Sequence, residues 1–305
     1  MGLFSVMELA EKLSSGLSTQ NVILAGIAVL LAINLKGLPC VWHIRLFRGL
    51  ATQLFLENPG KKLVGINGSA PRLFSYLVTT HRNPPIECDY NMHKSNSTFF
   101  SDLDINRSQL LVALFNGIPR WSPTPGGKEK RLMVALGGTS CVFKREIKPF
   151  QAYEVWSRVL TWDEKWLYIV SYFVKKGTGK SVLKAVEEKE KGQGQNAGFD
   201  SSKAILASSV SRYVFKYGRM TVPPESVLTK TGLYPDISSS EEPDKEDGSH
   251  TKTATAKEKK SWDLNMFEAQ KVRGLEAAML FQGSDAVGSH FEEMAVSVLG
   301  KYADI

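Results

Sequence analysis

Cysteine and histidine are scarce in this chain of 305 residues. The three cysteines, Cys40, Cys88 and Cys141, lie far apart, with no CxxC pair and no Cys/His cluster. Neither a disulfide framework nor a structural zinc site is indicated, and a reducing compartment fits best. The five histidines show no HxxxH or HxH spacing. We therefore expect no catalytic metal and no cofactor.

Several motifs of common enzyme classes are also missing. No serine lies in a G-x-S-x-G pattern, which argues against a serine hydrolase. Gly179-Lys180-Ser181 suggests a phosphate loop, but Val174 occupies the position where that loop needs glycine. The net charge of +7 is mild for this length and is spread along the chain. Nothing here requires a nucleic-acid partner, and we expect none.

The N-terminal part contains a long uncharged segment. No charged residue lies between Lys12 and Lys36, and the stretch 22–35 is apolar apart from Gly26 and Asn34. These 14 residues would cover only about 21 Å as a helix, less than the roughly 30 Å hydrocarbon core. We expect a single-pass membrane helix that borrows length from its flanks, with Lys36 snorkelling and Trp42 at the headgroup level.

The charges that follow this segment set the expected orientation. Lys36, Arg45, Arg48, Lys61 and Lys62 are opposed only by an acid at position 57, so the positive-inside rule places the folded part in the cytosol. A short anchor suits the thin bilayer of the endoplasmic reticulum. A cleaved signal peptide and a buried helix of the domain are the alternatives, although the basic start of a signal peptide is absent.

Composition divides the chain further. Residues 236–260 hold seven acids, five lysines and one large aliphatic residue, which cannot form a core. Residues after this stretch carry apolar positions of amphipathic helices, interrupted near 283–288, which we expect to pack back on the domain. Membrane or partner contact is the alternative. The expected segments are an anchor-bearing N-terminus (1–44), a connector (45–72), a folded domain (73–230), a disordered linker (231–261) and a C-terminal helical segment (262–305).

The folded domain combines one very apolar helix with several strands. Apolar residues from Phe99 to Phe115 recur mainly three, four and seven apart, which predicts a helix capped by Ser95 or Ser97. Strand patterns cover 74–80, 132–136, 139–147, 153–161, 166–174 and 205–216, with a bend at 137–138. This order predicts an α+β fold in which a curved antiparallel sheet wraps around a central helix.

The residues that suggest chemistry precede this helix. Asp89 lies four residues before His93, at the helix entrance, where free backbone N–H groups can polarise a carbonyl or hold an anion. A hydrolase of activated acyl groups could use Asp89 as base or nucleophile while helix-end amides stabilise the oxyanion. The structural alternative is that Asp89 and Asn96 only cap the helix and that His93 only orients the turn.

Together, Asp89, His93, Asn96 and Phe99 follow the D-x-x-x-H-x-x-N-x-x-[YF] pattern. The segment therefore resembles hot-dog-fold thioesterases of the 4-hydroxybenzoyl-CoA type. Further positions are similar to thioesterase superfamily member six and its fungal thioesterase-like relatives over roughly residues 73–228. These positions are Asp104, Arg107, Pro149, Phe150, Glu154, Val155, Arg158, Trp162, Asp163 and Tyr168.

The resemblance implies a hot-dog domain that forms a homodimer and hydrolyses acyl-CoA or acyl-carrier thioesters, in lipid metabolism. It implies catalytic roles for Asp89 and His93, and substrate contacts by Met92, Asn96, Phe99, Phe100 and Leu103.

One position departs from the pattern. Met92 stands where active relatives often have glycine, and its side chain could crowd the approaching thioester. The alternative is therefore an inactive hot-dog protein that binds acyl chains or acyl-CoA. A third possibility is a scaffold whose C-terminal helices recruit a partner. We expect Asp104 and Arg107 to form a salt bridge along the helix, and Trp162-Asp163 to form a structural turn.

Overall fold

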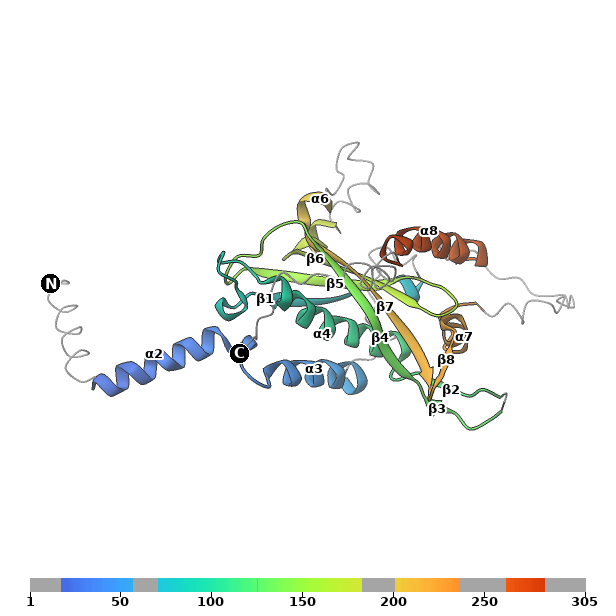
Figure 1. The fold of residues 1–305 in the computed structure, drawn as a ribbon, viewed down its shortest axis with the longest axis horizontal. Helices are drawn as coiled ribbons and strands as arrows, with labels where there is room; N and C mark the ends of the chain where they lie inside the picture. The colour runs from blue at the N-terminus through green and yellow to red at the C-terminus, as the bar shows by residue number, and fades with distance from the viewer. Residues whose placement is uncertain (1–17, 57–70, 125, 183–200, 236–261, 283–305) are drawn as a thin grey trace, which may run out of the picture.

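The computed structural model describes residues 18–56, 71–124, 126–182, 201–235 and 262–282. One antiparallel sheet forms its centre, with strand order β1-β5-β6-β7-β4 and β8 paired with β7 (Figure 1). The strands are β1 (Leu77–Arg82), β4 (Met133–Phe143), β5 (Ala152–Trp162), β6 (Leu167–Lys175), β7 (Ile205–Tyr217) and β8 (Met220–Val222). A separate two-stranded ladder contains β2 (Arg120–Trp121) and β3 (Lys130–Arg131).

Helices cover both faces of this sheet (Figure 1). The helices of the described residues are α2 (Thr19–Ile33), α3 (Val41–Ala51), α4 (Asn96–Phe115), α6 (Ser201–Ala204), α7 (Pro224–Lys230) and α8 (Leu264–Gln282). Of these, α2 has no buried residue and extends away from the sheet (Figure 1). Short helical turns occur at η1 (Leu35–Gly37), η2 (Thr52–Leu56), η3 (Arg72–Phe74) and η4 (Pro85–Glu87). Helix α3 packs beside α4, so the N-terminal segment joins the domain, and α3 crosses the expected boundary between positions 44 and 45.

The main core lies between α4 and one face of the sheet. Leu110 and Leu114 pack with Val159, Ile169 and Phe215, all of them buried. The apolar stripe of the sequence therefore forms the predicted helix inside the predicted curved sheet. This arrangement is the hot-dog fold that the resemblance implied.

Helix α8 covers the opposite face of the sheet. Ala278 packs with Leu160, Tyr168 and Val170, and the approach is close, because a Cβ at Gly274 would lie 2.6 Å from the Leu160 carbonyl oxygen. Strand β6 and the end of β5 are thus buried on both faces, which explains the nearly continuous apolar run of β6. The first half of β5 alternates between buried and half-buried positions. Packing of the C-terminal helix on the domain, as we expected, is confirmed for 264–282.

The strand predictions agree with the structure with one shift. The first strand begins at Leu77, not at 74, because residues 72–74 form the turn η3 with Leu73 and Phe74 buried. The bend at 137–138 is a β-bulge in the pairing of β4 with β7. The predicted linker begins too early at 231, because residues 231–235 belong to the folded domain and Leu233 and Tyr234 are buried in its main core. The rest of the predicted linker, 236–261, and the helix expected beyond 282 lie outside the described residues.

The expected membrane-spanning helix is not supported. Among the described residues, no helix has the length and apolar character needed to cross a membrane. Helix α2 has 15 residues and ends at Ile33, where the Asn34 side chain donates to the Leu30 carbonyl and accepts from the Ile86 N–H. The flank that was to lengthen the helix instead turns back onto the domain.

The two residues assigned to the membrane interface therefore have other roles. Lys36 does not snorkel: its side chain is only 14% exposed, and it forms ion pairs with Glu87 and Asp102. The Trp42 indole donates to the Ser101 carbonyl oxygen. Both contacts hold the N-terminal segment against the start of α4.

Candidate active site

The predicted catalytic pair lies in a tight loop before α4. The Asp89 N–H donates to the His93 carbonyl at 2.9 Å, and the Met92 N–H donates to the Asp89 carbonyl at 3.0 Å. Asn91 N–H donates to Asp89 Oδ1 at 2.9 Å, as in an Asx turn. Met92 closes the loop with φ = 59°, a left-handed conformation that favours glycine. The backbone thus explains why glycine suits this position.

This loop brings Asp89 and His93 together. Asp89 Oδ1 lies 3.5 Å from His93 Nδ1, and the two side chains are 26% and 30% exposed. The carboxylate is held on one oxygen only, since no described residue donates a hydrogen bond to Oδ2. An accessible carboxylate with free lone pairs beside an imidazole can take a proton or attack a carbonyl carbon.

The start of α4 lies directly after this pair. Ser95 is the N-cap residue, but its side chain makes no capping hydrogen bond, and Asn96 is the first helical residue rather than the cap. Capping by either side chain is therefore not what the structure shows. The first N–H groups of a helix have no intrahelical partner, so this end favours an anion or an oxyanion.

The residues expected to contact substrate divide into two groups. Met92 is 63% exposed and Asn96 is exposed, both at the loop. Phe99 and Leu103 are buried in a core cluster with Tyr153 and other side chains, and Phe100 packs against that cluster. The structure thus places Met92 and Asn96 beside Asp89 and His93, and the three apolar residues beneath them.

A buried ionic cluster that sequence reasoning missed lies next to this loop. Asp102 is fully buried, accepts from Lys36 Nζ at 2.9 Å and from Arg45 Nη2 at 2.9 Å, and forms an ion pair with Lys94 at 3.1 Å. The Tyr153 hydroxyl donates to the same carboxylate at 2.5 Å. Asp102 interrupts the apolar face of the helix, and a charge at such a position is the signal that could have indicated buried partners.

Burial and charge act in opposite directions on this cluster. Complete burial disfavours the charged carboxylate, but His81, Lys36 and Lys94 outweigh it and hold the pKa of Asp102 well below its usual range. Burial, reinforced by the neighbouring Asp102, raises the pKa of Tyr153 well above its usual value. Burial also lowers the pKa of Lys36. The cluster is therefore a fixed array of charges in a region of low dielectric constant.

The same cluster holds the loop that carries Asp89 and His93 at its two ends. Lys94 Nζ donates to Glu87 Oε2 at 2.6 Å, the Ser95 N–H donates to the Glu87 carbonyl, and Cys88 pairs with Lys94 in a β-bridge. Lys36 donates to the same Glu87 oxygen at 2.6 Å. Residues 88–93 thus form a closed loop whose base is held by a buried ion pair and by the N-terminal segment.

The expected salt bridge on α4 is present. Arg107 Nη2 donates to Asp104 Oδ1 at 2.6 Å, and the buried guanidinium also contacts the hydroxyls of Thr139 and Ser211. The predicted turn is also confirmed, since Asp163 Oδ1 accepts from the N–H groups of Lys165 and Trp166. Both features are structural and lie outside the loop of Asp89.

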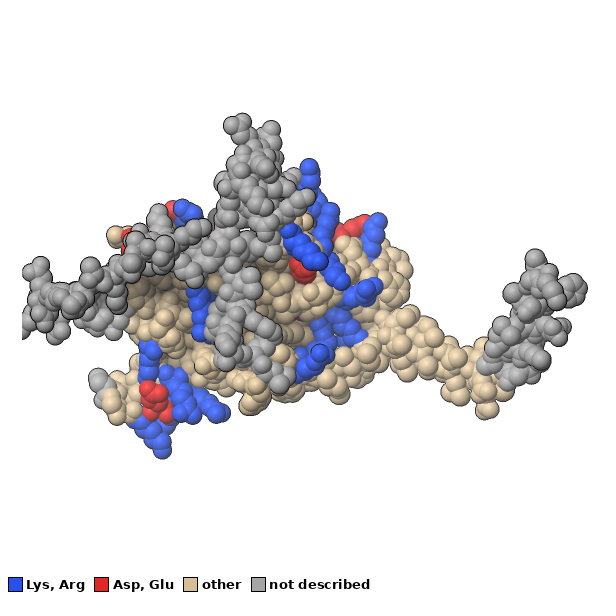
Figure 2. Space-filling model, turned by 180° about the vertical axis from the view of Figure 1, so that it is seen from behind, with Lys and Arg blue, Asp and Glu red and all other residues tan. Residues whose placement is uncertain are grey.

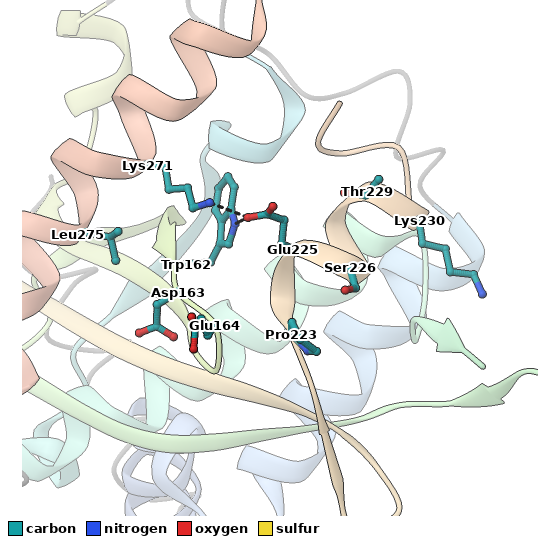
Figure 3. Close-up of a pocket in the computed structure, with 10 residues that line it drawn as sticks. All are labelled: Trp162, Asp163, Glu164, Pro223, Glu225, Ser226, Thr229, Lys230, Lys271 and Leu275. Carbon is teal, nitrogen blue, oxygen red and sulfur yellow. Dashed lines mark hydrogen bonds and ion pairs between the residues drawn. The ribbon is translucent and has the colours of Figure 1, made fainter. Parts of the chain in front are cut away.

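A wide cavity of about 1030 Å³ lies elsewhere, between the β5–β6 turn, α7 and α8 (Figure 3). In it, Glu225 accepts from Lys271 Nζ at 2.6 Å and from Trp162 Nε1 at 3.1 Å. Partial burial opposes ionisation of Glu225, but these two donors outweigh it and lower the pKa. None of the residues predicted from the sequence for the site lines this cavity.

Comparisons with known proteins identify the family of this chain. A family model described as the thioesterase-like superfamily matches residues 84–191, which include the loop and α4. The chain is 44% identical over 300 residues to the probable thioesterase atnL of Emericella nidulans, covering 94% of each chain. It is 38% identical over 288 residues to the thioesterase poxG of Penicillium oxalicum, covering 91% of this chain and 89% of that one.

Among solved structures, the probable thioesterase YbaW from Escherichia coli matches with a TM-score of 0.34 and 11% identity. The match covers 52% of this chain and 96% of that one.

Proposed function

The chain belongs to the thioesterase-like superfamily, and we propose that it hydrolyses an acyl thioester to a free acid and a thiol with Asp89 as the catalytic carboxylate. The observation that carries this proposal is the partly exposed Asp89, held on one oxygen beside His93 at the start of α4. Acyl-CoA and acyl-carrier thioesters are the proposed substrates, since the resemblance of the loop to acyl-CoA thioesterases extends through Phe99.

The proposed reaction uses the groups already described. Asp89 takes a proton from water, whose oxygen attacks the thioester carbonyl, and the first N–H groups of α4 stabilise the oxyanion. Collapse of the tetrahedral intermediate breaks the C–S bond, and the thiolate leaves and is protonated. Alternatively, Asp89 attacks directly, and water then hydrolyses the mixed anhydride. In both routes His93 lies close enough to orient Asp89.

We also propose that two copies pair through β4. This strand has 11 residues, lies at one edge of the sheet, and pairs with β7 alone within the described structure. Several apolar side chains of this strand are exposed, including Met133, Leu136 and Val142. A long apolar edge strand needs a partner to avoid uncontrolled association, and a second β4 would extend the sheet.

Thiol release by the full-length chain from acyl-CoAs of graded length tests the hydrolysis. Asp89→Asn retains shape but removes the carboxylate, and we expect turnover to fall about a hundredfold or more. Glu146→Gln is the matched control, since that carboxylate is 56% exposed and forms only a loose pair with Lys148 at 3.8 Å. The control should keep full turnover.

Other outcomes would change the conclusion. Full turnover by Asp89→Asn would remove this carboxylate from the chemistry. If wild type and variant are both inert while acyl-CoA still binds, the chain is a binding protein. Met92 favours that alternative, since its side chain stands at the mouth of the loop where active relatives often have glycine.

A further inference from the structure

A second cavity lies where the N-terminal segment meets the hot-dog domain. It has a volume of about 310 Å³ and is formed by α3 and η2 on one side and by β1 and α4 on the other. It does not include Asp89 or His93. The residues that line it are Arg45, Arg48, Gly49, Thr52, Thr79, Thr80, His81, Ile105 and Gln109.

No lining residue of this cavity is acidic, and several are hydrogen-bond donors. The Arg48 side chain is exposed, and no described residue pairs with its guanidinium. Arg45 uses Nη2 to hold Asp102 and contact His81, which leaves its other N–H groups without a described partner. The Thr80 hydroxyl and the Gln109 amide are likewise unpaired among the described residues.

The wall behind Arg45 carries excess positive charge. In the buried cluster, two carboxylates, Asp102 and Glu87, face three cations: Lys36, Lys94 and Arg45. One positive charge therefore remains without a carboxylate, even before Arg48 is added. Because the cluster is largely shielded from water, this charge is felt more strongly at the cavity than it would be in solvent.

Helices α3 and α4 are in close contact beside the cavity. A Cβ at Gly49 would lie 2.4 Å from Gln109 Nε2, so a larger residue there would displace the Gln109 side chain from its present position. Arg45, Arg48 and Thr52 follow one another at helical spacing and share the side of α3 that faces the cavity. The donors are thus gathered on rigid elements.

We propose that this cavity binds a phosphoryl group. Guanidinium groups match the oxygens of phosphate in a bidentate fashion, and two of them with a hydroxyl and an amide suit a tetrahedral dianion. The positive charge of Arg48, together with the one unbalanced positive charge of the buried cluster, neutralises such an anion. The proposal does not depend on thioester hydrolysis, because none of these residues lies in the loop of Asp89.

Two sources could supply the phosphoryl group. One is the phosphorylated carrier of a soluble thioester, and the other is a lipid headgroup. Near these arginines, α3 and η2 also expose apolar side chains, Ile44, Phe47 and Phe55, at 62%, 64% and 82%, and Ile44 lies one helical turn before Arg48. Residues 13–56 contain no acid, and Lys and Arg outnumber Asp and Glu on the face shown in Figure 2. A lipid surface with anionic headgroups would satisfy both the apolar side chains and the arginines.

Direct binding by the full-length chain tests the proposal. The probes are adenosine 3′,5′-bisphosphate, followed by calorimetry, and phosphatidylcholine vesicles with or without phosphatidic acid, followed by cosedimentation. Arg48→Gln should weaken one of these interactions about tenfold or more, since a charge-assisted contact is lost. Arg219→Gln is the matched control, because Arg219 is also exposed and unpaired among the described residues but lies beside β8.

The outcomes separate the possibilities. An effect of Arg48→Gln confined to the nucleotide supports a soluble phosphorylated carrier, and an effect confined to acidic vesicles supports a lipid headgroup. Equal losses in Arg48→Gln and Arg219→Gln would show that only net charge matters and would overturn the site. Absence of binding by both probes would overturn it as well. Thermal melting of both variants checks that the exposed substitutions leave folding intact.

Discussion

Two carboxylates near the start of α4 have opposite surroundings. Asp89 is 26% exposed, and only one of its oxygens has described partners, the Asn91 N–H and His93. Asp102 is completely buried, and both of its oxygens are held by cations and a tyrosine hydroxyl. The first is accessible to a substrate and has lone pairs to spare. The second has neither property.

This difference suits Asp89 to the proposed reaction and Asp102 to a structural role. A carboxylate that must accept a proton or attack a carbonyl cannot be saturated by fixed donors, since each donor stabilises its resting state. Asp102 instead holds Lys36 and Arg45 of the N-terminal segment against the domain, while Lys94 holds the loop that carries Asp89. The buried cluster supports the loop, and the exposed carboxylate performs the proposed reaction.

The largest effect is expected from Asp102→Asn. The substitution leaves the buried Lys94 and the partly buried Lys36 and Arg45 with one carboxylate among them. Removing one partner of a buried ionic group typically costs about 3 to 5 kcal/mol of unfolding free energy. Chemical denaturation of the full-length chain measures this loss, and Asp89→Asn should by contrast change stability little.

Glu146→Gln provides the control for stability as well as for turnover. Its pair with Lys148 is exposed, so the unfolding free energy should change by less than about 1 kcal/mol. If Asp102→Asn were as mild as this control, the cluster would not hold the N-terminal segment, and the contrast between the two carboxylates would be wrong.

Lowering the pH should also show the stabilising role of Asp102, with a smaller change in the unfolding free energy. Because the pKa of Asp102 is lowered by folding, its stabilising contribution is present above the unfolded value of about 3.9. It is lost as the pH falls through the folded pKa, where the native state must take up the proton. The slope is about 1.4 kcal/mol per pH unit for each proton taken up on unfolding. Unfolding free energies measured below pH 4 should show this slope in wild type and a shallower one in Asp102→Asn.

Much of the domain was predictable from local patterns. The apolar stripe between Phe99 and Phe115 predicted α4, and the glycines at 137–138 predicted a bend that the structure shows as a bulge in β4. Each of these features depends on residues close together in the sequence. The end of α2 was not predictable in this way, because it depends on contacts of Asn34 and Lys36 with residues about 50 positions later. The apolar character of the stretch 22–35 alone predicted a helix longer than α2.

The candidate site also has one part that depends on local sequence spacing and another that depends on long-range contacts. Asp89 and His93 could be found because they are four residues apart, in one turn. The cluster around Asp102 draws on the N-terminal segment, β1, α4 and β5, so no spacing in the sequence links its members. Only the position of a charged residue on an apolar helix face pointed to it. Which partners it would meet depended on how the N-terminal segment folds back.

Met92→Gly is expected to have the smallest effect, and it tests the surroundings of the accessible carboxylate, Asp89. Met92 has φ = 59°, so glycine would relieve strain in the loop, but it would also raise the entropy of the unfolded chain. These terms oppose each other, and the unfolding free energy should change by less than about 1 kcal/mol. Because the methionine side chain is 63% exposed at the loop, its removal opens the approach to Asp89. Thiol release should therefore stay equal or increase. A large loss of turnover with unchanged stability would mean that the methionine contacts the substrate.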